Sequence, residues 1–394
     1  MREWPEVFFK NRKTPFYYYD MQRLGDDVAR AKEAASRFNY HIHYAIKANH
    51  EQRILQLMRD SGFGADCVSE NELRSALKTG FAADDILLAG VGKTDEEITL
   101  AIKSDIKAIH VESIEELEVI EEIAKELNRP ARVAFRINPN VDAMTHPGIT
   151  TGLNENKFGI PESRFEQAID IIRSSEHIDL IGLHFHIGSQ IEKLEVFKNL
   201  ALRVNDIIRD FGSKGAKISY LNLGGGLGID YDRPENKVDF EAYFSQFHEL
   251  LELDPSVEVH FELGRSLVGQ CGNLVSKVLY VKKGELKEFL ILDAGMTELI
   301  RPALYNSFHQ VEVLNDNPLS RNYDIVGPVC ESSDLFARNR SMPLTKRNDI
   351  VVIRSAGAYG QVMSSNYNLR PNPEAVFSDE MPKIISKKKV IIQY

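Results

Sequence analysis

Hydrophobic and polar residues follow two different periods from about residue 38 to residue 265. Short runs rich in valine, isoleucine, leucine and aromatic residues have the character of β-strands, and most end at glycine, asparagine or serine. The stretches between them repeat hydrophobic residues at the spacing of amphipathic helices. The eight predicted strands are 41–47, 64–68, 85–89, 107–111, 132–138, 180–187, 220–224 and 258–263.

Three consecutive predicted helices begin with a capping box, in which a hydroxyl and a glutamate satisfy the first free N–H groups of the helix. The boxes are Ser69-x-x-Glu72, Thr94-x-x-Glu97 and Ser113-x-x-Glu116. A further helical pattern at 21–37 precedes the first strand. Eight strands alternating with helices predict a (β/α)8 barrel over residues 21–267. A doubly wound sheet is the competing architecture, but it usually has fewer strands.

The pattern changes after residue 268, where strand-like alternation replaces the helical period. Strands are expected at 276–281 and 289–292, joined by a turn at 282–285. The tyrosine-rich segment 14–20 has the pattern of an extra strand. We therefore expect an α/β protein with a TIM-type barrel followed by a β-rich C-terminal domain at 268–394, which residues 1–20 join.

Charge and composition exclude several classes of protein. The chain of 394 residues has a formal net charge of −10 and no dense cluster of basic residues, so no nucleic-acid partner is expected. The short lysine run at 387–389 is explained by a solvated tail or strand end. No hydrophobic run is long enough to span a bilayer, and the N-terminus has no signal-peptide pattern, so no membrane association is expected. Three cysteines without a CxxC motif predict a reduced, cytoplasmic protein with neither a disulfide scaffold nor a structural zinc.

Polar residues cluster where the predicted barrel strands end, which is the rim that carries active sites in such barrels. Lys47 ends the first strand, where partial desolvation would make its amine lose the proton more readily. This makes it a candidate nucleophile toward a carbonyl carbon, although taken alone it could be a lysine that merely reaches solvent. The other polar or glycine positions on this rim are Arg136, His184, His186, Ser189, Gly224–Gly226, Glu262 and Arg265.

Three of these features together indicate pyridoxal 5'-phosphate (PLP). A lysine can bond to the aldehyde of PLP, and a carboxylate can pair with its pyridine nitrogen. Glycines after the seventh strand can hold the phosphate with bare N–H groups, since no Cβ blocks the approach of the anion. We assign these roles to Lys47, to Glu262, and to Gly225 with Gly226.

On these residues the chain resembles the fold-type III PLP-dependent decarboxylases, of the alanine racemase and ornithine decarboxylase type. Tyr44-Ala-Ile-Lys47-Ala-Asn49 is similar to their PLP-lysine motif. His184-Phe-His-Ile-Gly-Ser-Gln190 is similar to the segment whose second histidine stacks on the cofactor ring. The resemblance implies that His186 stacks and Ser189 helps to hold phosphate. It also implies cofactor contacts from Asp66, Arg136, Gly264, Arg265 and Tyr359.

The C-terminal part is most similar to the diaminopimelate decarboxylase branch of that family. The motifs are Arg301-Pro-Ala-Leu-Tyr305, Gly327-Pro-Val-Cys-Glu-Ser-Ser-Asp334 and Ala356-Gly-Ala-Tyr359-Gly360, and segment 138–160 also matches. The branch usually has Glu-Pro-Gly-Arg where this chain has Glu262-Leu-Gly-Arg265, so the fixed φ of proline is lost.

This likeness implies decarboxylation of meso-2,6-diaminopimelate to L-lysine and CO2 by a homodimer. Cys330 and Glu331 would complete the site of the partner subunit, with Cys330 returning a proton to the substrate carbon and Lys47 as the rival donor. The substrate-binding residues implied are Arg265, Arg301, Tyr305, Glu331 and Tyr359.

Other interpretations stay open at this point. A related decarboxylase could act on ornithine, lysine, arginine or a carboxylated polyamine, but these substrates have no distal amino-acid centre for Arg301 and Glu331 to bind. Alternatively, Arg301 and Glu331 could form a structural ion pair. A zinc amidohydrolase could use His41-x-His43, but such barrels need an aspartate where the eighth strand carries Glu262. A regulator that binds PLP without catalysis would have no need of the complete set of rim residues.

Overall fold

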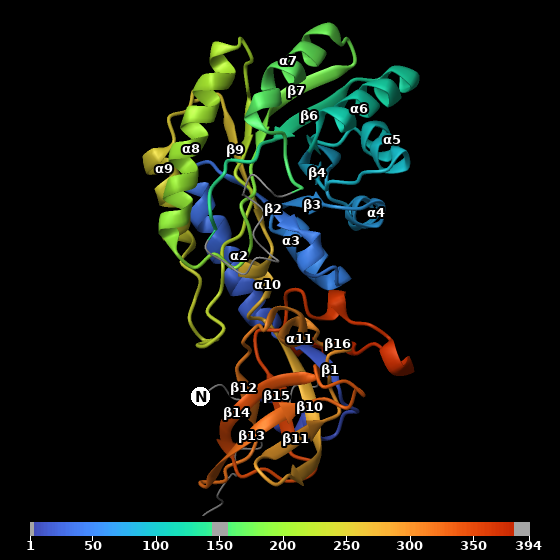
Figure 1. Ribbon diagram of the computed structural model, residues 1–394, viewed down its shortest axis with the longest axis vertical. Helices are drawn as coiled ribbons and strands as arrows, with labels where there is room; N and C mark the ends of the chain where they lie inside the picture. Colours follow the sequence, from blue (N-terminus) through green and yellow to red (C-terminus); the bar gives the residue numbers. More distant parts are fainter. Residues whose placement is uncertain (1–3, 144–156, 382–394) are drawn as a thin grey trace, which may run out of the picture.

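The computed structural model describes residues 4–143 and 157–381 (Figure 1). Most of the matched segment 138–160 and the lysine run at 387–389 lie outside the described residues. Figure 1 shows two stacked units, with the barrel above and a β-sheet domain below.

Eight parallel strands form a closed barrel in chain order, because β9 pairs back with β2. This confirms the (β/α)8 prediction. Several strands end two or three residues before their predicted ends, since the chain leaves the ladder to build the mouth of the barrel. The barrel strands are β2 His41–Ala45, β3 Gly64–Cys67, β4 Ile86–Leu88, β5 Ala108–Val111, β6 Ala131–Arg136, β7 Ile178–His184, β8 Tyr220–Asn222 and β9 Glu258–Leu263.

Amphipathic helices surround this barrel and bury their hydrophobic faces against it (Figure 1). In the part of the chain that the structure describes, no helix has the length and hydrophobicity needed to cross a bilayer. The helices are α2 Met21–Ser36, α3 Gln52–Asp60, α4 Glu70–Thr79, α5 Asp95–Ser104, α6 Ile114–Leu127, α7 Phe165–Ser174, α8 Leu194–Ser213 and α9 Phe240–Leu250.

The three predicted capping boxes differ in their glutamates. All three hydroxyl caps form, but the reciprocal bond to the cap residue is made in α5 alone among the three. In α4 and α6 the glutamate accepts from the residue before the cap, Val68 N–H at 2.8 Å and Glu112 N–H at 3.2 Å. These glutamates therefore hold the strand exits, which the sequence pattern did not predict.

The second unit is a mixed sheet in the order β12-β15-β10-β11-β13-β14, with β1 lying between β10 and β16. The predicted tyrosine-rich strand therefore joins this sheet, as expected; the boundaries at 267 and 268 stay a prediction. Short helices α1 Glu6–Lys10 and α11 Arg301–Tyr305 accompany it. The strands are β1 Phe16–Tyr19, β10 Gly272–Lys283, β11 Glu288–Leu292, β12 Val311–Val313, β13 Ser320–Val326, β14 Leu335–Pro343, β15 Ile350–Ile353 and β16 Glu374–Phe377.

Hydrogen bonds to backbone carbonyls join the two units where β2 ends. The Asn49 side-chain amide donates to the Gly357 carbonyl at 2.8 Å, and the Tyr359 N–H donates to the Ala48 carbonyl, also at 2.8 Å. The chain also passes directly from β9 through α10 Arg265–Val268 into β10. The C-terminal mouth of the barrel is therefore closed on one side by the β-sheet domain.

Candidate active site

Lys47 lies at this mouth, in a 3-10 turn (Ile46–Ala48) rather than in the predicted strand. Its Nζ donates to Asp66 Oδ2 at 2.6 Å, and Asp66 is fully buried on β3. Burial lowers the pKa of Lys47, but the attraction of Asp66 and Glu262 outweighs burial and raises it. The prediction that this amine loses its proton more readily is wrong, because two carboxylates hold it as an ammonium.

Glu262 lies buried on β9, and Asn222 of β8 fixes one of its oxygens. The two N–H groups of the Asn222 amide donate to Glu262 Oε1 at 3.0 Å and to the Tyr220 hydroxyl at 2.8 Å. The Asn222 carbonyl oxygen accepts from the Gly224 N–H at 2.8 Å, which sets the orientation of the amide. Burial raises the pKa of Glu262, while Lys47 and this bond from Asn222 oppose the rise. Sequence reasoning missed Asn222, although Asn222 and Tyr220 are two residues apart and therefore lie on the same face of the strand.

Two neutral histidines lie beneath Glu262. The rings of His110 and His184 stack with centroids 4.0 Å apart, and burial lowers the pKa of both well below the usual value. Their nitrogens approach Glu262 Oε1 at 3.5 Å and 3.2 Å, so these three residues have the spacing of metal ligands. The zinc hypothesis used a different pair. His41 is exposed, and His43 bonds to His260 at the opposite end of the barrel.

The glycine run is required by packing as well as by any ligand. Gly224 and Gly226 have φ of +66° and +96°, which L side chains rarely adopt. A Cβ at Gly225 would lie 1.8 Å from the Glu262 carbonyl oxygen. A Cβ at Gly264 would lie 3.0 Å from the Cβ of Ala48, beside the lysine turn. The sequence argument considered the anion alone and missed this close approach of the strands.

The glycine run also holds His186, the residue expected to stack on the cofactor ring. The Gly225 N–H donates to His186 Nδ1 at 3.3 Å, so in the neutral ring the proton lies on Nε2. Burial lowers the pKa of His186 well below the usual value, and nearby Arg136 and Lys47 lower it further. The ring is therefore uncharged and oriented, as a stacking partner for an aromatic cofactor should be.

Arg136 is engaged at the end of β6 in an ion pair with Glu112. The second oxygen of Glu112 accepts from the Gly159 N–H at 3.0 Å, and the Arg136 guanidinium lies 4.5 Å from the Phe158 ring centroid. Arg136 therefore ties the end of segment 138–160 to the rim. Its contact with the cofactor stays a prediction.

Two buried arginines meet where the barrel and the sheet domain join. Arg265 donates to the Tyr231 hydroxyl at 2.6 Å and to Ser189 Oγ at 2.9 Å, and its guanidinium lies 4.8 Å from the Tyr359 ring. Burial lowers the pKa of Arg301, and the charge of Arg265 lowers it further.

Arg301 donates to Ser307 Oγ at 3.2 Å and lies 6.0 Å from the Tyr305 ring. Within residues 4–143 and 157–381, no carboxylate forms an ion pair with Arg265 or Arg301. The alternative of a structural Arg301–Glu331 ion pair is therefore wrong for the single chain.

Cys330 and Glu331 are exposed on a loop between β13 and β14. Asp334 anchors this loop by accepting from the Val329 N–H at 2.7 Å and the Met296 N–H at 2.6 Å. In the described part of one chain, neither Cys330 nor Glu331 forms a hydrogen bond or ion pair with a barrel residue. The fold thus presents both side chains outward.

These residues fit PLP on the evidence of their own chemistry. The Lys47 side chain is 33% exposed, whereas Asp66 beside it is buried, so the lysine is open to the mouth of the barrel, as a lysine that bonds to an aldehyde must be. Because burial disfavours the charged form of Glu262, that form needs a cationic partner, which a protonated pyridine nitrogen supplies. A (β/α)8 barrel with this mouth, followed by a β-sheet domain, defines the class of PLP-dependent barrel enzymes.

Comparison with known proteins narrows the class. A family model described as the pyridoxal binding domain of pyridoxal-dependent decarboxylases matches residues 24–269. The chain belongs to this family of PLP-dependent carboxy-lyases, and the zinc amidohydrolase interpretation is wrong.

Its relatives place it in the diaminopimelate decarboxylase branch. The chain is 48% identical to diaminopimelate decarboxylase of Bacteroides thetaiotaomicron, over 95% of this chain and 97% of the relative. It is 40% identical to that of Campylobacter jejuni, over 91% and 89%. The crystal structure of diaminopimelate decarboxylase from Helicobacter pylori complexed with L-lysine matches with a TM-score of 0.89 and 39% identity, over 94% of this chain and 93% of the other.

Proposed function

We propose that this protein decarboxylates meso-2,6-diaminopimelate to L-lysine and CO2, the last step of lysine biosynthesis. The observation that carries the proposal is the pair Arg265 and Arg301, both buried and without an ion-pair partner among the described residues. Buried guanidinium groups require an anion, and they bind a carboxylate with two parallel hydrogen bonds. Diaminopimelate offers a second carboxylate at its distal end, whereas ornithine, lysine and arginine do not.

In this proposal the barrel residues hold the cofactor. Lys47 would anchor it covalently and His186 would stack on its ring. Ionised Glu262 would accept a hydrogen bond from the ring nitrogen and keep that nitrogen protonated. Ser189 and the backbone of Gly225 and Gly226 hold its phosphate. Bound PLP withdraws the electron pair that loss of CO2 leaves behind. The cofactor contacts of Asp66, Arg136, Gly264, Arg265 and Tyr359 belong to the same proposal.

The distal end of the substrate lies at the junction of the two units. Arg265 and Arg301 hold its carboxylate, Tyr305 and Tyr359 add hydrogen bonds, and Glu331 of a second subunit receives its ammonium. Cys330 of that subunit returns a proton from Sγ to the substrate carbon, with Lys47 Nζ as the rival donor.

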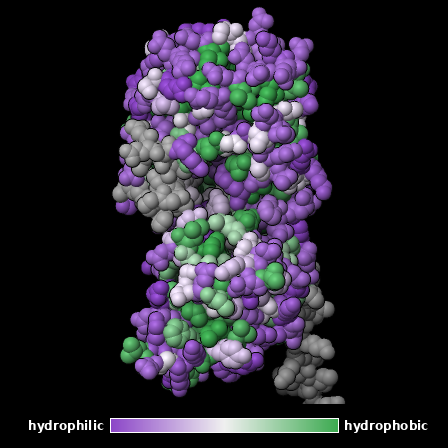
Figure 2. Space-filling model, turned by 45° about the vertical axis from the view of Figure 1, so that its right-hand side comes forward, coloured by the Kyte–Doolittle hydropathy of each residue, from purple (hydrophilic) through white to green (hydrophobic). Residues whose placement is uncertain are grey.

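We propose that the protein is a homodimer, because the proposed site uses residues of two subunits, and that it works in the cytoplasm. Exposure of the anchored Cys330–Glu331 loop supports it, because an exposed loop can reach the site of a second copy. Large hydrophobic side chains exposed on the same domain also support it, and hydrophobic residues gather on this half of the molecule in Figure 2. They include Leu304, Phe308, Tyr367 and Leu369.

Release of CO2 from meso-diaminopimelate, L-lysine, L-ornithine and L-arginine by the purified holoenzyme tests the substrate. We expect turnover with diaminopimelate and at least about 100-fold lower kcat/KM with the others, because each leaves the two arginines unpaired. Comparable rates with ornithine or arginine would contradict the proposal.

Subunit complementation tests the shared site. Lys47→Ala and Cys330→Ala proteins are mixed in equal amounts, unfolded and refolded together. Half of the dimers are then mixed, and each of those has one intact site, so about a quarter of wild-type activity is expected. Recovery of no activity, with both variants folded, would place Lys47 and Cys330 in the same subunit.

A further inference from the structure

We propose that Tyr231 determines substrate specificity by holding Arg265 in position for the distal carboxylate. This inference rests on the proposed function. Tyr231 lies in the loop between β8 and α9 and is not part of any family motif named in the sequence analysis. Tyr231 is buried, with 9% of its surface exposed.

The hydroxyl of Tyr231 orients Arg265 without neutralising it. Of the two terminal nitrogens of Arg265, Nη1 donates to the Tyr231 hydroxyl at 2.6 Å and Nη2 donates to Ser189 Oγ at 2.9 Å. The Nε atom has no hydrogen-bond partner among the described residues. A carboxylate in place of the phenol would cancel the charge, whereas a neutral acceptor fixes the plane of the guanidinium and leaves its charge for a ligand.

The ring of Tyr231 also keeps the second arginine nearby. The guanidinium carbons of Arg265 and Arg301 lie 6.0 Å and 5.4 Å from its centroid, within the range of cation–π attraction. His309 packs edge-on at 5.0 Å and adds no charge, because burial and Arg301 lower its pKa to about 3. Tyr231 thus holds two cations close together, which in a buried place requires compensation by an anion.

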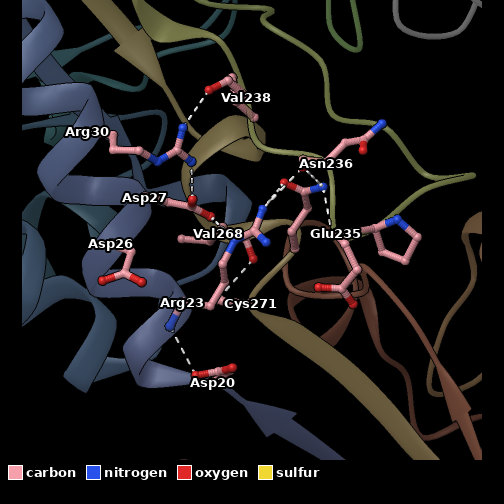
Figure 3. Close-up of polar contacts among 12 residues, drawn as sticks. Asp20, Arg23, Asp26, Asp27, Arg30, Glu235, Asn236, Val238, Val268 and Cys271 are labelled. Atoms are coloured by element: carbon pink, nitrogen blue, oxygen red, sulfur yellow. Dashed lines mark hydrogen bonds and ion pairs between the residues drawn. The ribbon is translucent and has the colours of Figure 1, made fainter. Parts of the chain in front are cut away.

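The loop between β8 and α9, which includes Tyr231, is bonded to side chains of α2 through its later residues Asn236 and Val238 (Figure 3). Arg23 donates to the Asn236 carbonyl at 3.3 Å, and Arg30 donates to the Val238 carbonyl at 2.7 Å. Asp27 lies between the two arginines and pairs with both. These bonds hold the loop at Asn236 and Val238 through contacts within the chain, so they need no ligand.

The test uses the holoenzyme of Tyr231→Phe, which keeps the ring and removes the hydroxyl. Loss of a hydrogen bond to a charged group predicts a KM for diaminopimelate about 10- to 100-fold higher, with kcat changed by less than about threefold. L-lysine is the product of the proposed reaction, and when it binds in the product orientation its single carboxylate lies at the two arginines. Inhibition by L-lysine should therefore weaken by the same factor. Inhibition by cadaverine, which has no carboxylate, should not change.

Tyr243→Phe is the matched control, since Tyr243 is buried on α9 and its hydroxyl has no hydrogen-bond partner among the described residues. We expect it to behave as wild type with both ligands. A double variant tests whether Tyr231 acts through Arg265. In an Arg265→Lys background, Tyr231→Phe should weaken inhibition by L-lysine by less than about threefold further, since both substitutions remove the same contact.

The outcomes separate the two proposals. If wild-type enzyme does not decarboxylate diaminopimelate, the proposed function fails whatever Tyr231 does. If wild type is active but Tyr231→Phe leaves inhibition by L-lysine unchanged, or weakens inhibition by L-lysine and by cadaverine equally, the proposed role of Tyr231 is overturned. Should Tyr231→Phe not fold, an Arg265→Lys enzyme without selective loss of L-lysine affinity would equally overturn it.

Discussion

Replacing Gly225 by alanine should damage both stability and cofactor binding. The new Cβ would lie 1.8 Å from the carbonyl oxygen of Glu262 and 2.9 Å from its carbonyl carbon, and both belong to the main chain of β9. Neither atom can rotate away, so β9 and the glycine segment that follows β8 must separate locally by about 1 Å. Overpacking of this kind costs about 1–3 kcal/mol, and we expect the upper end because backbone has to move.

The same displacement has a functional consequence. Glu262 N–H donates to the Gly224 carbonyl at 2.8 Å, so separation of the strands strains this bond and moves the Glu262 carboxylate. We therefore expect PLP to bind more weakly to Gly225→Ala. Urea unfolding of the cofactor-free protein measures the stability, and titration with PLP followed by absorbance measures the affinity.

Gly25→Ala in helix α2 is the control, because a Cβ there meets no atom within 4 Å. Alanine in a helix interior should stabilise the protein by about 0.5–1 kcal/mol and leave PLP binding unchanged. The packing argument would be refuted if Gly225→Ala unfolded at the wild-type urea concentration and bound PLP equally well.

Four further predictions concern the lysine, its carboxylate partner and the cysteine. Lys47→Ala should neither turn over nor show the visible absorption of covalently bound PLP; retention of either contradicts the anchoring role. Cys330→Ala should lose about 10²–10⁴-fold in kcat with PLP still bound, as measured by steady-state kinetics and absorbance, because a general acid is missing. The raised pKa of Lys47 predicts that PLP attaches to the cofactor-free protein faster as pH rises above neutrality, since the neutral amine reacts, and Asp66→Asn should shift this stopped-flow profile to lower pH. Burial raises the pKa of Asp66 to about 6, so the folded state binds its proton more tightly than the unfolded state, and up to about 3 kcal/mol of stability present below pH 4 should be lost by pH 7. Asp66→Asn should flatten that loss in urea titrations across this pH range, and an unchanged profile would argue against the burial effect.

Much of the fold and several of the proposed site residues follow from the sequence itself. The two-residue and helical periods are local properties, because each strand or helix must bury one face, and they predicted all eight barrel strands in order. Lys47 and Glu262 could be selected for a similar reason, since parallel strands in a barrel bring their C-terminal ends to one rim.

The tertiary structure decided what depends on neighbours distant in the chain. The charge of Lys47 is opposite to the expectation from burial alone, because Asp66 on the next strand and Glu262 on the last one outweigh desolvation. Asn222 and Tyr231 have no local signal strong enough to select them, since their roles come from the groups that they contact. Periodicity therefore determined which elements form and where the rim lies. Only the packed barrel determined which rim residues are charged, oriented or unpaired, because those properties are sums over contacts between strands.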